Sequence, residues 1–88
     1  MRDIDRVIER VKAGLPNVSW EQLKVTHPAD DNGLWFFSLP GLKEDVQAES
    51  SSGMCPFIVE GNKKGQCVSC PTIEETADRI IEWLKLLG

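Results

Sequence analysis

The spacing of hydrophobic residues changes twice along this 88-residue chain, and that change restricts the fold more than any other sequence feature. Apolar residues recur every three or four positions in residues 4–15 and again in residues 73–87, which is typical of amphipathic helices. Between these segments apolar and polar residues alternate, as they do in half-buried strands. The predicted order is therefore helix, four or five short strands, helix, and the central alternation excludes a helical bundle.

Both predicted helices have recognisable ends. Asp3 is expected to cap the first helix, and Gly14-Leu15-Pro16 ends it near residue 13. Thr72 and Glu75 form a capping box at the start of the second helix. The apolar stripe of the first helix comprises Ile4, Val7, Ile8, Val11 and Leu15, and that of the second comprises Ile73, Ala77, Ile80, Ile81, Leu84 and Leu87.

Five segments between the helices are expected to form strands. They are residues 20–27, 33–39, 45–50, 57–60 and 66–69. The connections between them are short, which favours an antiparallel meander with both helices packed on one face. We therefore expect an α+β fold that forms a single domain over residues 1–88.

The segment "GLWFFSL" is the one predicted strand without alternation. Trp35, Phe37 and Leu39 point to one side of it. Leu34 and Phe36 point to the other side, so the strand is apolar on both faces. Since the helices cover only one face, we predict that Trp35, Phe37 and Leu39 form a partner-binding surface on the uncovered face. Two alternatives stay open: loops of the same chain cover that face, or two copies of the chain associate through it.

All three cysteines lie in the stretch from Cys55 to Cys70. Cys55, Cys67 and Cys70, with the single histidine His27, would supply the four ligands of a zinc site. In a strand, however, Cys67 and Cys70 face opposite sides, which favours unligated thiols. A third alternative is a disulfide between Cys55 and Cys70 under oxidation, because the expected strand register brings them close together.

The sequence specifies no catalytic site. Cys55 and His27 would make a nucleophilic dyad, but no third group is indicated that would orient the base. The chain contains neither a glycine-rich phosphate loop nor a nucleophile elbow. We therefore assign no catalytic residue and no cofactor, apart from the alternative zinc site, and we favour a function that is not enzymatic.

The charge balance bears on the kind of partner. Ten Lys and Arg against fourteen Asp and Glu give a net charge of −4. This balance argues against nucleic-acid binding and favours a protein partner with a cationic patch. No apolar run approaches the roughly 20 residues of a membrane helix, and the first residues lack an apolar signal segment. With an odd number of cysteines, these features predict a cytoplasmic protein with no membrane partner.

Two stretches of the chain carry a resemblance. The run "DDNGLWFFSLPG…VQAESSSGMCPFIVEG", followed by "TIEETADRIIEWL", covers the chain from about residue 31 to the carboxyl end. It resembles small single-domain bacterial α+β proteins of unknown function. In size and acidity the chain is also similar to immunity and inhibitor-like proteins. The resemblance contributes no catalytic motif, so no functional residue is carried over from it.

Two functional hypotheses result. The first, which we favour, is a protein-interaction module that binds another protein, or a second copy of itself, through the sheet face around Trp35 and Phe37. The alternative is a small zinc-binding or thiol-dependent domain that uses Cys55, Cys67 and Cys70.

Overall fold

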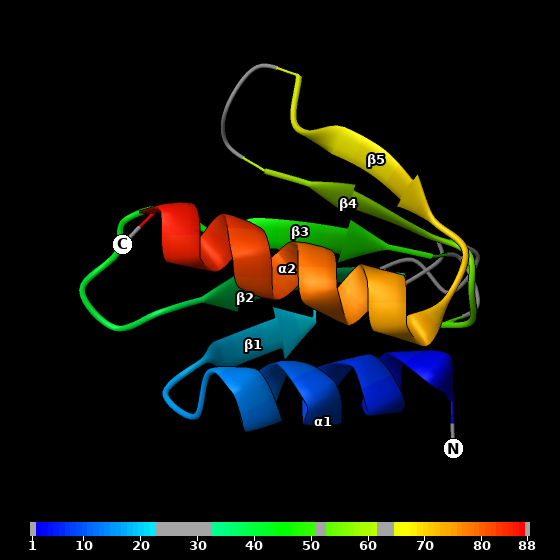
Figure 1. The fold of residues 1–88 in the computed structure, drawn as a ribbon, viewed down its shortest axis with the longest axis horizontal. Helices are drawn as coiled ribbons and strands as arrows, with labels where there is room; N and C mark the ends of the chain where they lie inside the picture. Colours follow the sequence, from blue (N-terminus) through cyan, green and yellow to red (C-terminus); the bar gives the residue numbers. More distant parts are fainter. Residues whose placement is uncertain (1, 23–32, 51–52, 62–64, 88) are drawn as a thin grey trace.

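The computed structural model describes residues 2–22, 33–50, 53–61 and 65–87. In chain order its elements are α1 (Asp3–Gly14), β1 (Ser19–Gln22), β2 (Leu34–Ser38), β3 (Val46–Glu49), β4 (Phe57–Glu60), β5 (Cys67–Cys70) and α2 (Ile73–Leu87). Each strand pairs antiparallel with the next, so the sheet has the order β1-β2-β3-β4-β5 (Figure 1). The prediction of an α+β fold built on an antiparallel meander is confirmed. The predicted strand at 20–27 begins one residue earlier, and its residues 23–27 lie outside the described part of the chain.

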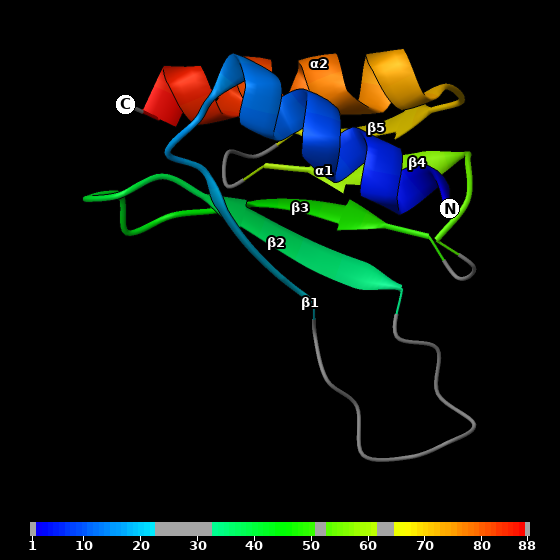
Figure 2. The ribbon, with the colours of Figure 1, turned by 90° about the horizontal axis from the view of Figure 1, so that it is seen from below.

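The two helices form a layer on one side of the sheet, as predicted (Figure 2). α2 packs against β2, β3, β4 and β5, and α1 packs against α2. Apolar stripes explain this arrangement, since each helix buries its stripe between the other helix and the strands. Within the described residues, neither helix combines the length and the hydrophobicity that a membrane span requires.

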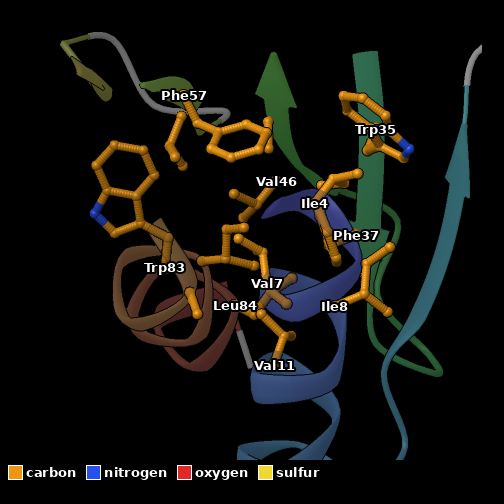
Figure 3. Packing of buried hydrophobic residues seen from close by; sticks show 14 of the residues in the cluster. Ile4, Val7, Ile8, Val11, Trp35, Phe37, Val46, Phe57, Trp83 and Leu84 are labelled. Atoms are coloured by element: carbon orange, nitrogen blue, oxygen red, sulfur yellow. The ribbon is translucent and has the colours of Figure 1, made fainter. Parts of the chain in front are cut away.

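The hydrophobic core lies between the helices and the sheet. Trp35 and Phe37 point into it from β2, with 2% and 0% of their surfaces exposed (Figure 3). The ring of Trp35 packs edge-on against that of Phe57, with centroids 6.4 Å apart. The prediction that Trp35 and Phe37 lie on the uncovered face is therefore wrong. Because side chains alternate along a strand, Leu34 and Phe36 point away from the helices instead.

The register of β2 against β3 explains this outcome. Phe37 pairs with Val46 and Trp35 pairs with Ala48, so both aromatic residues share a face with the apolar positions of β3. Phe36 pairs with Gln47 on the opposite face. Directly opposed residues project to the same side of an antiparallel sheet, so the alternation of β3 determines which face of β2 the helices cover.

The start of α1 is tied to a distant part of the chain. Its N-cap residue is Arg2, whose backbone N–H donates a hydrogen bond to Asp5 Oδ2 at 3.1 Å. Asp3, the predicted cap, has a different role. Its Oδ2 accepts a hydrogen bond of 2.9 Å from the backbone N–H of Cys55. The carboxylate of Asp3 thereby links the first turn of α1 to the connection between β3 and β4.

A second contact holds the same connection in place. The backbone N–H of Ile4 donates to the carbonyl oxygen of Gly53 at 2.9 Å. Gly53 has a φ of 72°, which is favourable for glycine and costly for other residues. A Cβ atom at this position would also lie 3.3 Å from Cγ2 of Ile4. The connection between β3 and β4 is therefore packed tightly against α1.

The predicted start of α2 is confirmed. Thr72 Oγ1 accepts a hydrogen bond of 3.1 Å from the backbone N–H of Glu75, which satisfies one of the free donors of the first turn. Thr76 is fully buried, and its hydroxyl donates to the carbonyl oxygen of Thr72 at 2.7 Å. Near the other end, Trp83 is buried and the guanidinium of Arg79 lies 5.7 Å from its ring centroid.

Candidate functional site

The side of the sheet opposite the helices is the candidate site. Strand pairing determines which residues lie on it, because directly opposed residues project to the same face. We call this set the helix-free face. It comprises Ser19, Glu21, Leu34, Phe36, Ser38, Gln47, Glu49, Ile58, Glu60, Cys67 and Ser69.

Apolar side chains occupy the middle of the helix-free face. Phe36 and Leu34 lie next to each other along β2 and are half-buried. On β4, Ile58 is 43% exposed although its neighbours in the strand belong to the core. A hollow of about 350 Å³ adjoins Ile58, and Met54, 41% exposed, lines it from the connection between β3 and β4. The remaining lining residues are Glu49, Ser50, Cys55, Pro56 and Ser69.

Carboxylates surround these apolar groups. Glu21 pairs with Phe36, and Glu49 lies between Leu34 and Ile58 in one cross-strand row. Glu60 is exposed at the end of β4. Among the described residues of the helix-free face there is no lysine or arginine. The face therefore combines apolar contact area with a negative electrostatic potential.

The three residues predicted to bind a partner do not form one surface. Trp35 and Phe37 are in the core. Leu39 follows β2 and is half-buried against the core, at a separate hollow of about 330 Å³ between the α1–β1 turn and the end of β2. Ile58 and Glu49 were not among the predicted binding residues. The sequence offered no signal for Ile58, because Phe57, Ile58 and Val59 are three consecutive apolar residues. Only the structure shows that Phe57 and Val59 are the buried positions of that strand.

All three cysteines are free thiols, in three different environments. Cys67 is exposed on the helix-free face, and its Sγ lies 3.7 Å from Glu60 Oε1. Cys70 is buried on the opposite face, where it pairs with Phe57. The structure thus separates two of the four predicted zinc ligands, as expected for positions three apart in a strand.

His27, the fourth predicted zinc ligand, lies outside the described residues. Across residues 2–22, 33–50, 53–61 and 65–87, no group of three His, Cys, Asp or Glu side chains converges in a way that would hold a metal ion. The zinc hypothesis therefore gains no support from the described geometry.

Cys55 is poorly suited to act as a nucleophile. Burial, together with a hydrogen bond to Asp3 and the charges of Asp3, Glu74 and Cys70, raises the pKa of its thiol from 9.0 to about 11. At neutral pH the group is a protonated thiol, and the thiolate is the reactive species. The predicted dyad partner, His27, is outside the described residues. The strand register on which the Cys55–Cys70 disulfide alternative was based is wrong by one residue, because Cys70 pairs with Phe57 and not with Pro56.

The raised pKa of Cys55 predicts slow alkylation. In a variant that carries Cys67→Ser and Cys70→Ser, Cys55 should react with iodoacetamide at pH 8 about 100-fold more slowly in the folded than in the unfolded chain. Its rate should keep increasing tenfold per pH unit up to about pH 11, the pKa of the folded state. Mass spectrometry of timed samples gives both rates. Restricted access alone would lower the rate but leave its plateau near pH 9, and that result would contradict the prediction.

The helix-free face combines apolar and acidic groups. It is built from all five strands, and the contacts of α1 with the β3–β4 connection position its hollow. Comparison of the chain with protein-family models, curated protein sequences and solved structures finds no match.

Proposed function

We propose that the protein is a non-enzymatic interaction module that binds a basic protein partner through its helix-free face. The observation that carries this proposal is the exposed Ile58 beside an open hollow, with Glu49 paired directly opposite it and Glu60 in the neighbouring cross-strand row of the same face. Large apolar side chains at the centre of a polar rim are typical of protein interfaces. Carboxylates at the rim steer a cationic partner toward this centre.

The charge of the face favours a foreign partner over a second copy of the chain. Two copies facing each other would bring Glu21, Glu49 and Glu60 of one copy close to the same residues of the other. Like charges across an interface disfavour association. Nucleic acid is disfavoured for the same reason, since its phosphates are also negative.

The proposal is consistent with the likeness in size and acidity to immunity and inhibitor-like proteins, since an acidic surface suits a basic target. We further propose the cytoplasm as its compartment, on the basis of three unpaired cysteines. The thiol-dependent alternative has less support, because Cys67 and Cys70 project to opposite faces of β5.

A pair of lysine substitutions tests the location of the binding surface. Ile58→Lys places a cation at the apolar centre of the helix-free face, and we expect it to weaken partner binding about tenfold or more. Leu86→Lys is the matched control, since Leu86 is an equally apolar residue, 60% exposed, on the helical layer. The immobilised wild-type protein would capture partners from an extract of its source organism, and calorimetry would then measure the affinity of each variant for the purified partner.

Comparison of the two variants shows which surface the partner uses. Unchanged partner affinity of the Leu86→Lys variant, together with weakened affinity of the Ile58→Lys variant, would support the proposal. Equal binding by all three proteins, or a loss confined to the Leu86 variant, would show that the partner uses another surface. Sedimentation of the wild-type protein alone reports self-association, which the proposal does not expect.

A further inference from the structure

The outer edge of β5 is a second feature that points to a binding role, and it depends on the backbone of β5 rather than on the side chains of the helix-free face. β5 is the last strand of the sheet and pairs only with β4 among the described strands. Figure 1 shows it at the margin of the sheet, beyond β4. An outer strand directs half of its backbone N–H and C=O groups away from the sheet, where another chain can bond to them.

The register identifies these outward groups. The backbone N–H of Gly61 donates to the carbonyl oxygen of Gln66 at 2.9 Å, which fixes the alternation of the β4–β5 ladder. In an antiparallel pair every second residue bonds to the partner strand, so the peptide groups of Val68 and Cys70 face β4. The N–H and C=O of Ser69 therefore point outward.

The edge of β5 is short, with four residues, but it lacks three of the devices that prevent strand addition. Natural edge strands are protected by charged residues, by proline or by bulges. The sequence of β5, "CVSC", contains no charged residue and no proline, and its pairing with β4 is continuous. By contrast β1, the other edge strand, contains Glu21.

A groove lined mainly by polar and charged residues lies beside this edge. It has a volume of about 370 Å³ and separates β5 from the adjacent side of α2. Its lining residues are Val68, Ser69, Cys70, Glu75, Asp78, Arg79 and Glu82. Arg79 bonds to Glu82 at 3.1 Å, and Asp78 Oδ1 lies 3.5 Å from Nε of Arg10 on α1, so two ion pairs are already formed here. Glu75 is the remaining carboxylate of the lining. The groove wall is therefore net negative.

We propose that the edge of β5 accepts an extended, basic polypeptide segment as a sixth strand. Ser69 would exchange backbone hydrogen bonds with the added segment, whose lysine or arginine side chains would reach the carboxylate of Glu75. This mode of recognition draws affinity from the main chain and selectivity from side chains at alternate positions. A second copy of this protein is the less suitable occupant, because symmetric pairing of two β5 edges would bring two acidic groove walls together.

A synthetic peptide provides the probe. It has eight residues, alternates lysine with threonine and is blocked at both ends; a peptide that alternates glutamate with threonine is the control. With the isotope-labelled full-length protein, we expect amide shifts to concentrate in residues 67–70 and 75–82. Hydrogen exchange at the Ser69 amide should slow about tenfold or more at saturation. The glutamate peptide should cause no saturable shift.

Two substitutions at one position separate the backbone contact from the side chain. Ser69→Pro removes the outward N–H without removing a ladder bond to β4, and proline is tolerated on sheet edges. It should weaken binding of the lysine peptide about tenfold or more, because the ring also obstructs the edge. Ser69→Ala keeps the N–H and should bind as the wild-type protein does.

A charge variant keeps the test decisive if Ser69→Pro fails to fold. Glu75→Gln should weaken binding about twofold to fivefold, whereas Glu44→Gln, a neutralisation in the β2–β3 connection, should not. Four results would overturn the proposal: no saturable binding at millimolar peptide, shifts confined to residues of the helix-free face outside β5, equal binding by a folded Ser69→Pro protein, or unchanged binding by the charge variant. A wild-type dimer that Ser69→Pro dissociates would overturn it too, since a second copy would then occupy the edge.

Discussion

Replacing Phe37 by alanine is expected to destabilise the fold by about 3–5 kcal/mol, because the substitution leaves a cavity in a fully buried site. The adjacent substitution, Phe36→Ala, should cost about 1 kcal/mol, since Phe36 is half-buried on the helix-free face and water can replace part of the lost contact. A chain of 88 residues has a total stability of roughly 4–13 kcal/mol. The Phe37 variant should therefore lose a large share of its stability.

Denaturant unfolding followed by tryptophan fluorescence measures both changes. Phe36 and Phe37 are the same residue type in the same strand, so strand propensity and lost side-chain volume are matched. The difference between the two losses in unfolding free energy therefore reports how much more a phenylalanine contributes on the covered face of β2 than on the uncovered face. If both variants lost equal stability, the assignment of Phe37 to the core side of β2 would be wrong.

The secondary structure could be predicted because each element is consistent with its own sequence. The alternation of Val46 and Ala48 with Gln47 and Glu49 matches the burial of β3 position by position. Thr72 has the same capping role in the structure that the sequence indicates. Short connections left an antiparallel meander as the simplest topology, and the structure has that topology.

The orientation of β2 could not be predicted from β2 itself. Trp35 with Phe37, and Leu34 with Phe36, are two apolar pairs, so local hydrophobicity does not distinguish the two faces. The decision depends on a neighbour, because pairing of Phe37 with Val46 places the larger pair beside the apolar side of β3. The register of β2 against β3 depends on the turn and the length of the connection between them. The hydrophobic pattern of β2 alone gives no information about it.

The environment of the cysteines was predictable in part for a similar reason. Opposite orientations of Cys67 and Cys70 follow from their spacing within one strand, and the structure agrees. The burial of Cys55 and its contact with Asp3 join residues 52 positions apart in the chain. A contact of this kind depends on how the β3–β4 connection packs against α1, which is a tertiary feature. Asp3 also meets the sequence criteria for a helix N-cap, but in the structure its carboxylate bonds to the backbone N–H of Cys55 and Arg2 is the N-cap.

The second prediction with a large expected effect concerns the affinity for a basic partner when acidic residues of the helix-free face are reversed in charge. Glu49→Lys combined with Glu60→Lys should weaken binding of a basic partner by about 2–4 kcal/mol, which corresponds to a loss of affinity of roughly 30-fold to 1,000-fold. Each reversal removes an attraction and adds a repulsion, so each is expected to cost more than a neutralisation. Both residues are exposed, and neither belongs to the core, so the fold should persist.

A second double variant, Glu9→Lys with Glu44→Lys, changes the net charge equally but alters α1 and the β2–β3 connection. It distinguishes a contact of the partner with Glu49 and Glu60 from a general effect of the net charge of the protein. Calorimetry at low and at physiological salt should show the wild-type affinity decreasing with salt, because ions screen exposed charges beyond about 8–10 Å. The affinity of the Glu49 and Glu60 variant should depend on salt much less, or in the opposite direction. If the two double variants lost affinity equally, the net charge alone would explain binding, and the helix-free face would have no specific role.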